Sequence, residues 1–197
     1  MVIAAPLVLL TGRSRRRTGS ADGRSARRCS KAGSAHKIAA MNAANRPAET
    51  APSDPLVARA RAAALAAYAP YSRFSVGCAI ESVDGEIAVG ANMENACYRL
   101  DLCAEQSALT AAQHAFGLDK VARIAVAGGA ASGGSLSGDV TCTPCGGCRQ
   151  AIYEASCLSG QDVEIICSNG SGSTSERHSI RSLIPHGFGP ANLTDAG

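Results

Sequence analysis

Two short segments of the chain carry residues whose types and spacing could do chemistry. The segment CAEQ places Cys103 two residues before Glu105, and the segment PCGGCRQ carries Cys145 and Cys148 as a Cys-x-x-Cys pair. Three thiolates can hold one zinc ion, and a catalytic zinc keeps its fourth position for water. A carboxylate beside that water could move protons without binding the metal. The pattern favours one catalytic Zn²⁺ per chain and a hydrolytic reaction that needs a proton shuttle.

A Cys-x-x-Cys pair by itself also fits two other kinds of site. It could be a redox pair, or half of a structural zinc site. A structural zinc wants a fourth ligand, and Cys142 or Cys97 could supply it. A non-catalytic zinc module would have no need of Glu105, so this glutamate favours the catalytic interpretation.

Both segments stand where a helix is predicted to begin. Residues 103–117 contain good helix formers, with an acid in the first turn and Gly117 at the end. Residues 145–156 predict a second helix, although two glycines lower its propensity. Free N–H groups and the positive end of the helix dipole favour the thiolate form of cysteines at helix starts. Two helices lying side by side would bring the three thiolates to one ion.

The remaining elements alternate in a way that predicts an α/β fold. A helix is expected over 54–68, with Asp54 as N-cap and a proline at the first helical position. Two antiparallel strands, 74–82 and 86–92, flank an Asp-Gly turn. Further strands are predicted at 121–129, at 162–168 and within 171–180, and a loop is predicted at 131–141. This order predicts a three-layer α/β/α domain around a mixed β-sheet.

Charge and aromatic content divide the chain into two parts. Residues 1–52 hold ten of the 19 Lys and Arg residues, two of the 16 Asp and Glu residues, and no aromatic residue. We therefore predict a disordered basic extension over 1–52 and a zinc-dependent catalytic domain over 53–197. The opening apolar run is too short to span a membrane and follows no positive charge. An Arg- and Ser-rich extension leaves an organelle-targeting peptide as an alternative.

Cysteine usage indicates the compartment. The chain has nine cysteines, an odd number, and no convincing export signal. This argues against a disulfide framework and for a reducing compartment, the cytoplasm. Cys78 and Cys167 lie in apolar runs and are expected to be small buried hydrophobes.

Five stretches of the chain, in order, resemble the cytidine deaminase family, specifically its small homotetrameric three-cysteine zinc class. They are AYAPYSRFSVGCA at 67–79, NMENACY at 92–98, CAEQSA at 103–108, PCGGCRQ at 144–150 and LIPHGFGP at 183–190. The resemblance implies a cytidine deaminase-like fold, a nucleoside substrate and a homotetramer. The implied reaction converts cytidine and deoxycytidine to uridine and deoxyuridine with release of ammonia, a step of pyrimidine salvage.

The resemblance also implies roles for individual residues. The zinc ligands are Cys103, Cys145 and Cys148, and Glu105 is the catalytic proton shuttle. The substrate binders are Phe74 beside the pyrimidine, Asn92 and Glu94 at the ribose hydroxyls, the backbone carbonyl of Ala104 at the amine, and Phe188, which reaches into a neighbouring subunit's site.

One position departs from the pattern of the three-cysteine class. Three thiolates on Zn²⁺ leave a net negative charge, and the class usually places an arginine directly after the catalytic glutamate to donate to the sulfurs. Here that position is Gln106. Arg149 matches a second family arginine and could supply the compensation alone, or could be a solvated helix residue.

Other functions remain open at this stage. Blasticidin-type deaminases share the cysteine and glutamate core, but the Asn92-x-Glu94 pair and the Phe188 ending favour a nucleoside. A polynucleotide deaminase would need a basic groove with aromatic residues, and the catalytic domain is acidic and lacks tryptophan. We expect no specific nucleic acid partner and no membrane association, although the basic extension could touch nucleic acid weakly.

Overall fold

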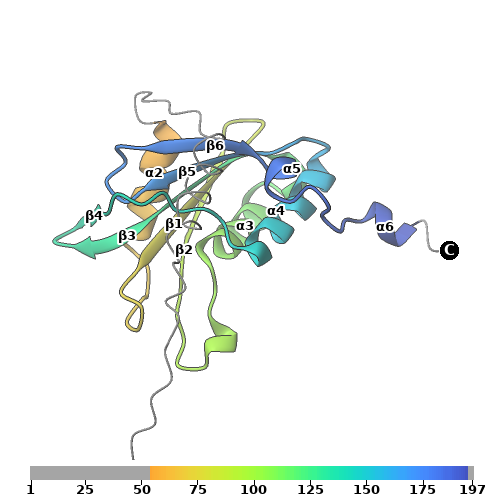
Figure 1. Cartoon of the computed structure of the whole chain (residues 1–197). Helices are drawn as coiled ribbons and strands as arrows, with labels where there is room; N and C mark the ends of the chain where they lie inside the picture. Colours follow the sequence, from red (N-terminus) through yellow and green to blue (C-terminus); the bar gives the residue numbers. More distant parts are fainter. Residues whose placement is uncertain (1–53, 195–197) are drawn as a thin grey trace, which may run out of the picture. The chain divides into compact units, whose positions relative to one another are not determined.

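The computed structural model describes residues 54–194, and these form the predicted α/β/α arrangement (Figure 1). The predicted disordered extension over 1–52 lies outside the described residues, so it stays a prediction. Within the described part of the chain, no helix is both long and apolar enough to cross a membrane.

A mixed sheet forms the middle layer. Its strands follow the order β2 (Ile87–Ala91), β1 (Ser75–Ser82), β3 (Val121–Ser132), β5 (Glu164–Asn169) and β6 (Ser175–Ser179), and β4 (Ser135–Ser137) pairs with the end of β3. β3 and β5 are parallel, whereas the other neighbouring strands are antiparallel. The predicted hairpin across the Asp-Gly turn is confirmed, since β1 and β2 pair as expected.

Alternate residues of the strands face two different helical layers. On one face α2 (Pro55–Ala64) packs on Ala79, Ala125 and Ile166. On the other, α3 (Ala104–Ala115) and α4 (Gly146–Ser159) pack on a cluster that includes Ile80, Ile124 and Ile165. Cys78 and Cys167 are fully buried in this second cluster, as predicted. The short helices α5 (Ile180–Leu183) and α6 (Ala191–Thr194) follow β6.

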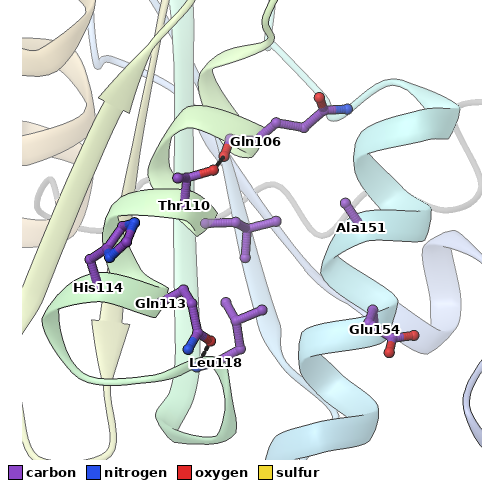
Figure 2. Close-up of a pocket in the computed structure, with 8 residues that line it drawn as sticks. Gln106, Thr110, Gln113, His114, Leu118, Ala151 and Glu154 are labelled. Carbon is purple, nitrogen blue, oxygen red and sulfur yellow. Dashed lines mark hydrogen bonds between the residues drawn. The ribbon is translucent and has the colours of Figure 1, made fainter.

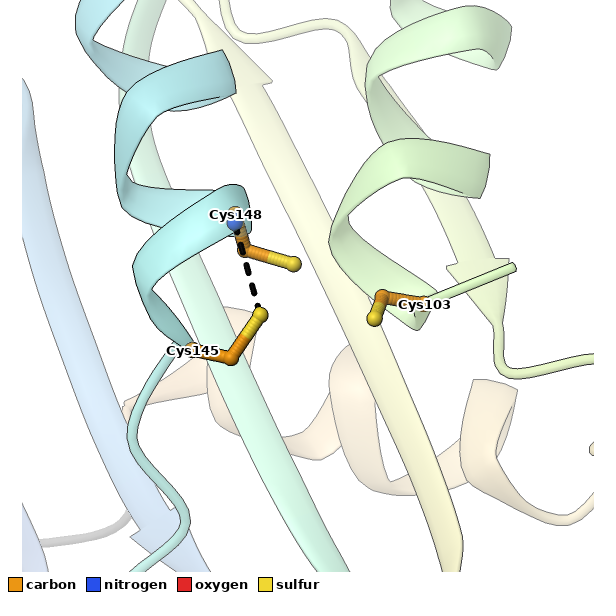
Figure 3. A group of neighbouring side chains, drawn as sticks. All are labelled: Cys103, Cys145 and Cys148. Atoms are coloured by element: carbon orange, nitrogen blue, oxygen red, sulfur yellow. Dashed lines mark hydrogen bonds between the residues drawn. The ribbon is translucent and has the colours of Figure 1, made fainter. Parts of the chain in front are cut away.

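The order of elements brings the starts of α3 and α4 together. α3 leads into β3, and α4 connects β3 to the parallel strand β5. Each helix therefore runs opposite to the strand that follows it, and both helices begin beside the ends of β3 and β5. Figure 3 shows the first turns of the two helices side by side.

Two element boundaries differ from the sequence predictions. The first helix ends at Ala64 and not at Tyr68, because the backbone of Tyr68 leaves the helix to bond the carbonyl of Asn92 and the N–H of Glu94. The predicted loop at 131–141 contains β4. Gly133 and Gly134 both have positive φ, which allows the two-residue hairpin turn between β3 and β4.

Candidate active site

Three cysteine sulfurs meet where α3 and α4 begin. Cys103 is the N-cap of α3, Cys145 is the N-cap of α4, and Cys148 lies in the first turn of α4. Their Sγ atoms all lie within 4.8 Å of one another (Figure 3). Tetrahedral zinc with Zn–S bonds of about 2.3 Å needs sulfurs about 3.8 Å apart, so a small contraction would let this set hold the ion.

The donor set resembles a catalytic site and not a closed structural one. Among residues 54–194, the cluster contains three cysteines, and neither Cys142 nor Cys97 belongs to it. A structural zinc site normally has four protein ligands, whereas a catalytic site has three and an open position.

The helix starts affect the three thiols differently. The backbone N–H of Cys148 donates to Cys145 Sγ at 3.5 Å and holds the pKa of that thiol below its usual range. Burial raises the pKa of Cys103 and of Cys148 instead. The prediction that a helix start lowers the thiol pKa therefore holds for Cys145. At Cys103 and Cys148 the effect of burial on the pKa is larger than the effect of the helix start. A bound divalent cation would favour the thiolate form of all three.

Glu105 lies in the first turn of α3, two residues after Cys103, and is 5% exposed. Burial raises the pKa of its carboxyl group. The neighbouring thiols include Cys148, which donates to the carboxylate and partly opposes this shift. A buried carboxyl that holds its proton at higher pH than usual is suited to accept and return protons during hydrolysis.

Phe74 and Cys142 meet over the backbone of Gly128 near the end of β3. A Cβ atom at Gly128 would lie 2.9 Å from both Cys142 Sγ and Phe74 Cε1. Burial and the nearby Glu105 raise the pKa of Cys142 to about 11, so this thiol stays neutral. Phe74, whose ring is 45% exposed, thus lies beside a thiol that is close to Glu105. The sequence pattern indicated Phe74 and named Cys142 only as a possible fourth ligand of a structural zinc, and it missed Gly128.

Asn92 and Glu94 both turn toward the segment before β1. Asn92 accepts from the N–H of Val76 at 2.8 Å and donates to the carbonyl of Phe74 at 3.0 Å. Glu94 Oε2 accepts from the N–H of Tyr71 at 2.9 Å and of Ser72 at 3.2 Å. The Ser72 hydroxyl and these N–H groups lower the pKa of Glu94. Both predicted ribose binders therefore also fix the backbone that carries Phe74.

The other predicted site residues have clear positions. The carbonyl of Ala104 packs against Gly90 of β2, where a Cβ atom would approach it to 2.8 Å. Gln106 extends from α3 toward α4 (Figure 2). It lines a groove of about 410 Å³ between these helices, which none of the clustered cysteines lines.

Arg149 contacts backbone carbonyls. Its Nε donates to the carbonyl of Pro144 at 2.9 Å, and another guanidinium nitrogen donates to the carbonyl of Leu183 at 3.3 Å. These bonds tie the start of α4 to the end of α5. Its predicted donation to the sulfurs stays a prediction.

Phe188 lies on the surface of α4, with 57% of its area exposed. The side-chain amide of Gln150 donates to the carbonyl of Phe188 and accepts from its N–H at 3.3 Å. Gln150 was missed at the sequence level, although it belongs to the PCGGCRQ segment.

Comparison with known proteins gives a consistent result. Residues 52–159 match the family model described as the cytidine and deoxycytidylate deaminase zinc-binding region. The chain is 36% identical over 140 residues to a cytidine deaminase of Halalkalibacterium halodurans, covering 71% of this chain and 96% of that relative. It is 33% identical over 141 residues to a cytidine deaminase of Sporosarcina psychrophila, covering 72% of this chain and 94% of the relative.

Solved structures agree with these relatives. A crystal structure of cytidine deaminase from Burkholderia pseudomallei matches with a TM-score of 0.58 at 37% identity, covering 68% of this chain and 96% of that one. The cytidine deaminase structure from Mycobacterium tuberculosis matches with a TM-score of 0.52 at 32% identity, covering 68% of this chain and 94% of the other.

Proposed function

The chain belongs to the cytidine deaminase family, and we propose that it deaminates cytidine and deoxycytidine hydrolytically to uridine and deoxyuridine, releasing ammonia. One structural observation gives this proposal its strongest support. Three sulfurs within 4.8 Å of one another lie beside a buried glutamate in the first turn of α3. This combination suits hydrolysis and has no evident use in a structural zinc module.

Cys103, Cys145 and Cys148 would hold the zinc ion. Zinc in such a site supplies a water molecule acidic enough to attack a pyrimidine ring at neutral pH. Glu105 would take a proton from the attacking water and pass it to N3 as C4 is attacked, and it would then take the proton of the new C4 hydroxyl group and pass it to the departing amine. The burial of Glu105 supports this role, because its raised pKa makes the carboxylate a stronger base and keeps the carboxyl protonated to higher pH than usual.

The surroundings of the site favour an uncharged nucleoside. The ring of Phe74, seated on Gly128 beside the neutral thiol of Cys142, offers an apolar wall for the pyrimidine. Asn92 and Glu94 retain polar atoms for the ribose hydroxyls. The lowered pKa of Glu94 keeps this carboxylate charged, so it would repel a phosphate group.

The active form is a homotetramer whose sites are shared between subunits. Phe188 supports this proposal, because its backbone is bonded to Gln150 on α4 while its ring remains 57% exposed. A ring held in this way can cover the base bound by a neighbouring chain. We place the enzyme in the cytoplasm, since all eight described cysteines are free and the site needs reduced thiols.

An isotope experiment tests the reaction class. Cytidine is incubated with the zinc-loaded protein in water enriched in the heavy oxygen isotope, and the nucleoside product is analysed by mass spectrometry together with ammonia release. The proposal predicts uridine that carries one heavy oxygen atom, with equimolar ammonia. Uridine without the heavy isotope would rule out hydrolysis by water.

A further inference from the structure

Gln150 holds the backbone of Phe188 from both sides. Its Nε2 donates to the carbonyl of Phe188, and its Oε1 accepts from the N–H of the same residue at 3.3 Å. A side-chain amide that bonds both polar groups of one residue fixes the direction in which that residue's side chain leaves the backbone. Because Phe188 is 57% exposed, these bonds hold a residue that has little packing of its own.

Two glycines beside Phe188 let the chain lie close against α4. A Cβ atom at Gly187 would lie 2.8 Å from the ring of Tyr153. At Gly189, a Cβ atom would lie 3.0 Å from Cys157 Sγ and 3.1 Å from the same ring. Tyr153 and Gln150 are three residues apart on α4 and so share one face of it. The segment around Phe188 is therefore seated along this face.

This face differs from the one that carries the thiol cluster. Successive residues of a helix are rotated by about 100°, so the directions of Gln150 and Cys148 around α4 differ by about 160°. Cys148 is buried toward α3, whereas the segment after α5 runs along the other side of α4 and on to α6 (Figure 1). The backbone of Phe188 is therefore held on a different face of α4 from the one that carries Cys148.

We propose that Gln150 is a positioning residue for the substrate site of a neighbouring subunit, although it lies two residues from Cys148 of its own chain. It holds Phe188 in the orientation in which the ring reaches the neighbour's base. This inference rests on the proposed nucleoside deamination at shared sites, and it assigns Gln150 to the chain that supplies Phe188 and not to the chain that supplies Glu105.

Mixed oligomers test this assignment. Three inactive or weakened chains are compared: Glu105→Gln, Phe188→Ala and Gln150→Ala. Gln150→Ala should keep its full zinc content, lower the thermal midpoint only slightly and raise KM for cytidine roughly tenfold, which is the scale expected when the two hydrogen bonds that hold Phe188 are lost. Gln161→Ala is the matched control, because this exposed glutamine follows α4 and should leave KM unchanged.

The pattern of complementation distinguishes the two assignments. Gln150→Ala mixed with Glu105→Gln should exceed both parents at low cytidine, because some sites then combine an intact Glu105 with a correctly held Phe188. Gln150→Ala mixed with Phe188→Ala should show no gain. Gln150→Glu keeps the acceptor for the Phe188 N–H and should have a KM between those of wild type and Gln150→Ala.

Each alternative result overturns a specific step. Loss of zinc from Gln150→Ala would assign Gln150 to its own chain's site and overturn the inference. The same conclusion would follow if Gln150→Ala gained activity when mixed with Phe188→Ala but not when mixed with Glu105→Gln. No gain between Glu105→Gln and Phe188→Ala would overturn shared sites and this inference together, while leaving deamination intact. Lack of cytidine turnover by the wild-type protein would overturn the proposed function itself.

Discussion

Glu105 and the three cysteines occupy neighbouring positions, and the proposed reaction gives them separable roles. The glutamate is 5% exposed and its pKa is raised by burial, whereas the sulfurs of Cys103, Cys145 and Cys148 lie within 4.8 Å of one another and can share an ion. Replacing a residue that only moves protons should leave the metal bound, whereas replacing a metal ligand should release it.

The substitution Glu105→Gln should therefore abolish turnover while zinc stays bound. The expected loss in kcat is at least the ~10²–10⁴-fold that general acid–base catalysis contributes. Cys145→Ala should instead lose zinc and much of the fold's stability. Metal analysis and kcat on the same preparations check both results, and a Glu105→Gln protein that came out free of zinc would show that the glutamate binds the metal.

Gln106 tests whether the cluster lacks positive charge. The guanidinium group of Arg149 donates to two backbone carbonyls. An arginine at position 106 would therefore add a positive charge near the sulfurs that Arg149 does not supply. Gln106→Arg should raise activity or move the acid limb of the pH–rate profile to lower pH, because positive charge near thiolates draws electron density from the metal. An unchanged acid limb and an unchanged kcat would mean that the thiolate cluster does not need a positive charge at position 106.

At the scale of elements, a charged network joins α2 to the sheet. Asp54, the N-cap of α2, accepts from the N–H of Leu56 at 3.0 Å and pairs with Arg123 at 2.5 Å and Arg177 at 2.7 Å. The same two arginines also bond Glu164. Burial alone would raise the pKa of Asp54 and of Glu164, but these partners outweigh it and hold both values below their usual range.

This network predicts a loss of stability in acid. Because the folded-state pKa values of Asp54 and Glu164 are lowered, their stabilisation is complete above the unfolded carboxyl pKa of about 4 and is lost as the pH falls through the folded values. Asp54→Asn keeps an N-cap but removes the charge, so the free energy of unfolding should depend less on pH in this window. Asp54→Ala should also lose the ~0.5–2 kcal/mol of the cap.

Denaturant unfolding at several pH values checks this expectation. Asp84→Asn is the matched control, because Asp84 forms an exposed pair with Lys120 and should leave the pH dependence nearly unchanged. Equal pH dependence in Asp54→Asn and wild type would show that the network does not contribute.

Most elements were predictable because their patterns are local. Asp54-Pro55 and the Asp-Gly turn mark the first helix and the hairpin, and the two cysteine segments mark the starts of α3 and α4. The end of α2 was not predictable, since it depends on long-range bonds between Tyr68 and the end of β2. Gly133-Gly134 did carry a hairpin signal that the loop prediction overlooked.

The candidate site divides in the same way. The place of Glu105 beside the clustered sulfurs could be predicted, because Glu105 and the cysteines lie in short ordered motifs. The contact of Cys142 with Gly128 and the bonds between Gln150 and Phe188 join distant positions, so they required the three-dimensional structure.

At the scale of the whole molecule, the exposed ring of Phe188 predicts an oligomer with shared sites. Mass measurement in solution should give a homotetramer. Mixing Glu105→Gln with Phe188→Ala chains should restore activity above both parents, because some sites then have an intact Glu105 and a neighbour's intact Phe188. A monomeric mass, or a mixture no more active than the average of its parents, would rule out shared sites.

The central claim is that this chain is a nucleoside deaminase. The most direct measurement follows the ultraviolet absorbance of purified, zinc-loaded protein with cytidine, deoxycytidine, CMP and cytosine, using Glu105→Gln as the blank. We expect rapid turnover of cytidine and deoxycytidine, and slower turnover of CMP because the charged Glu94 would repel its phosphate. Faster turnover of CMP than of cytidine, or no turnover of either nucleoside, would contradict it.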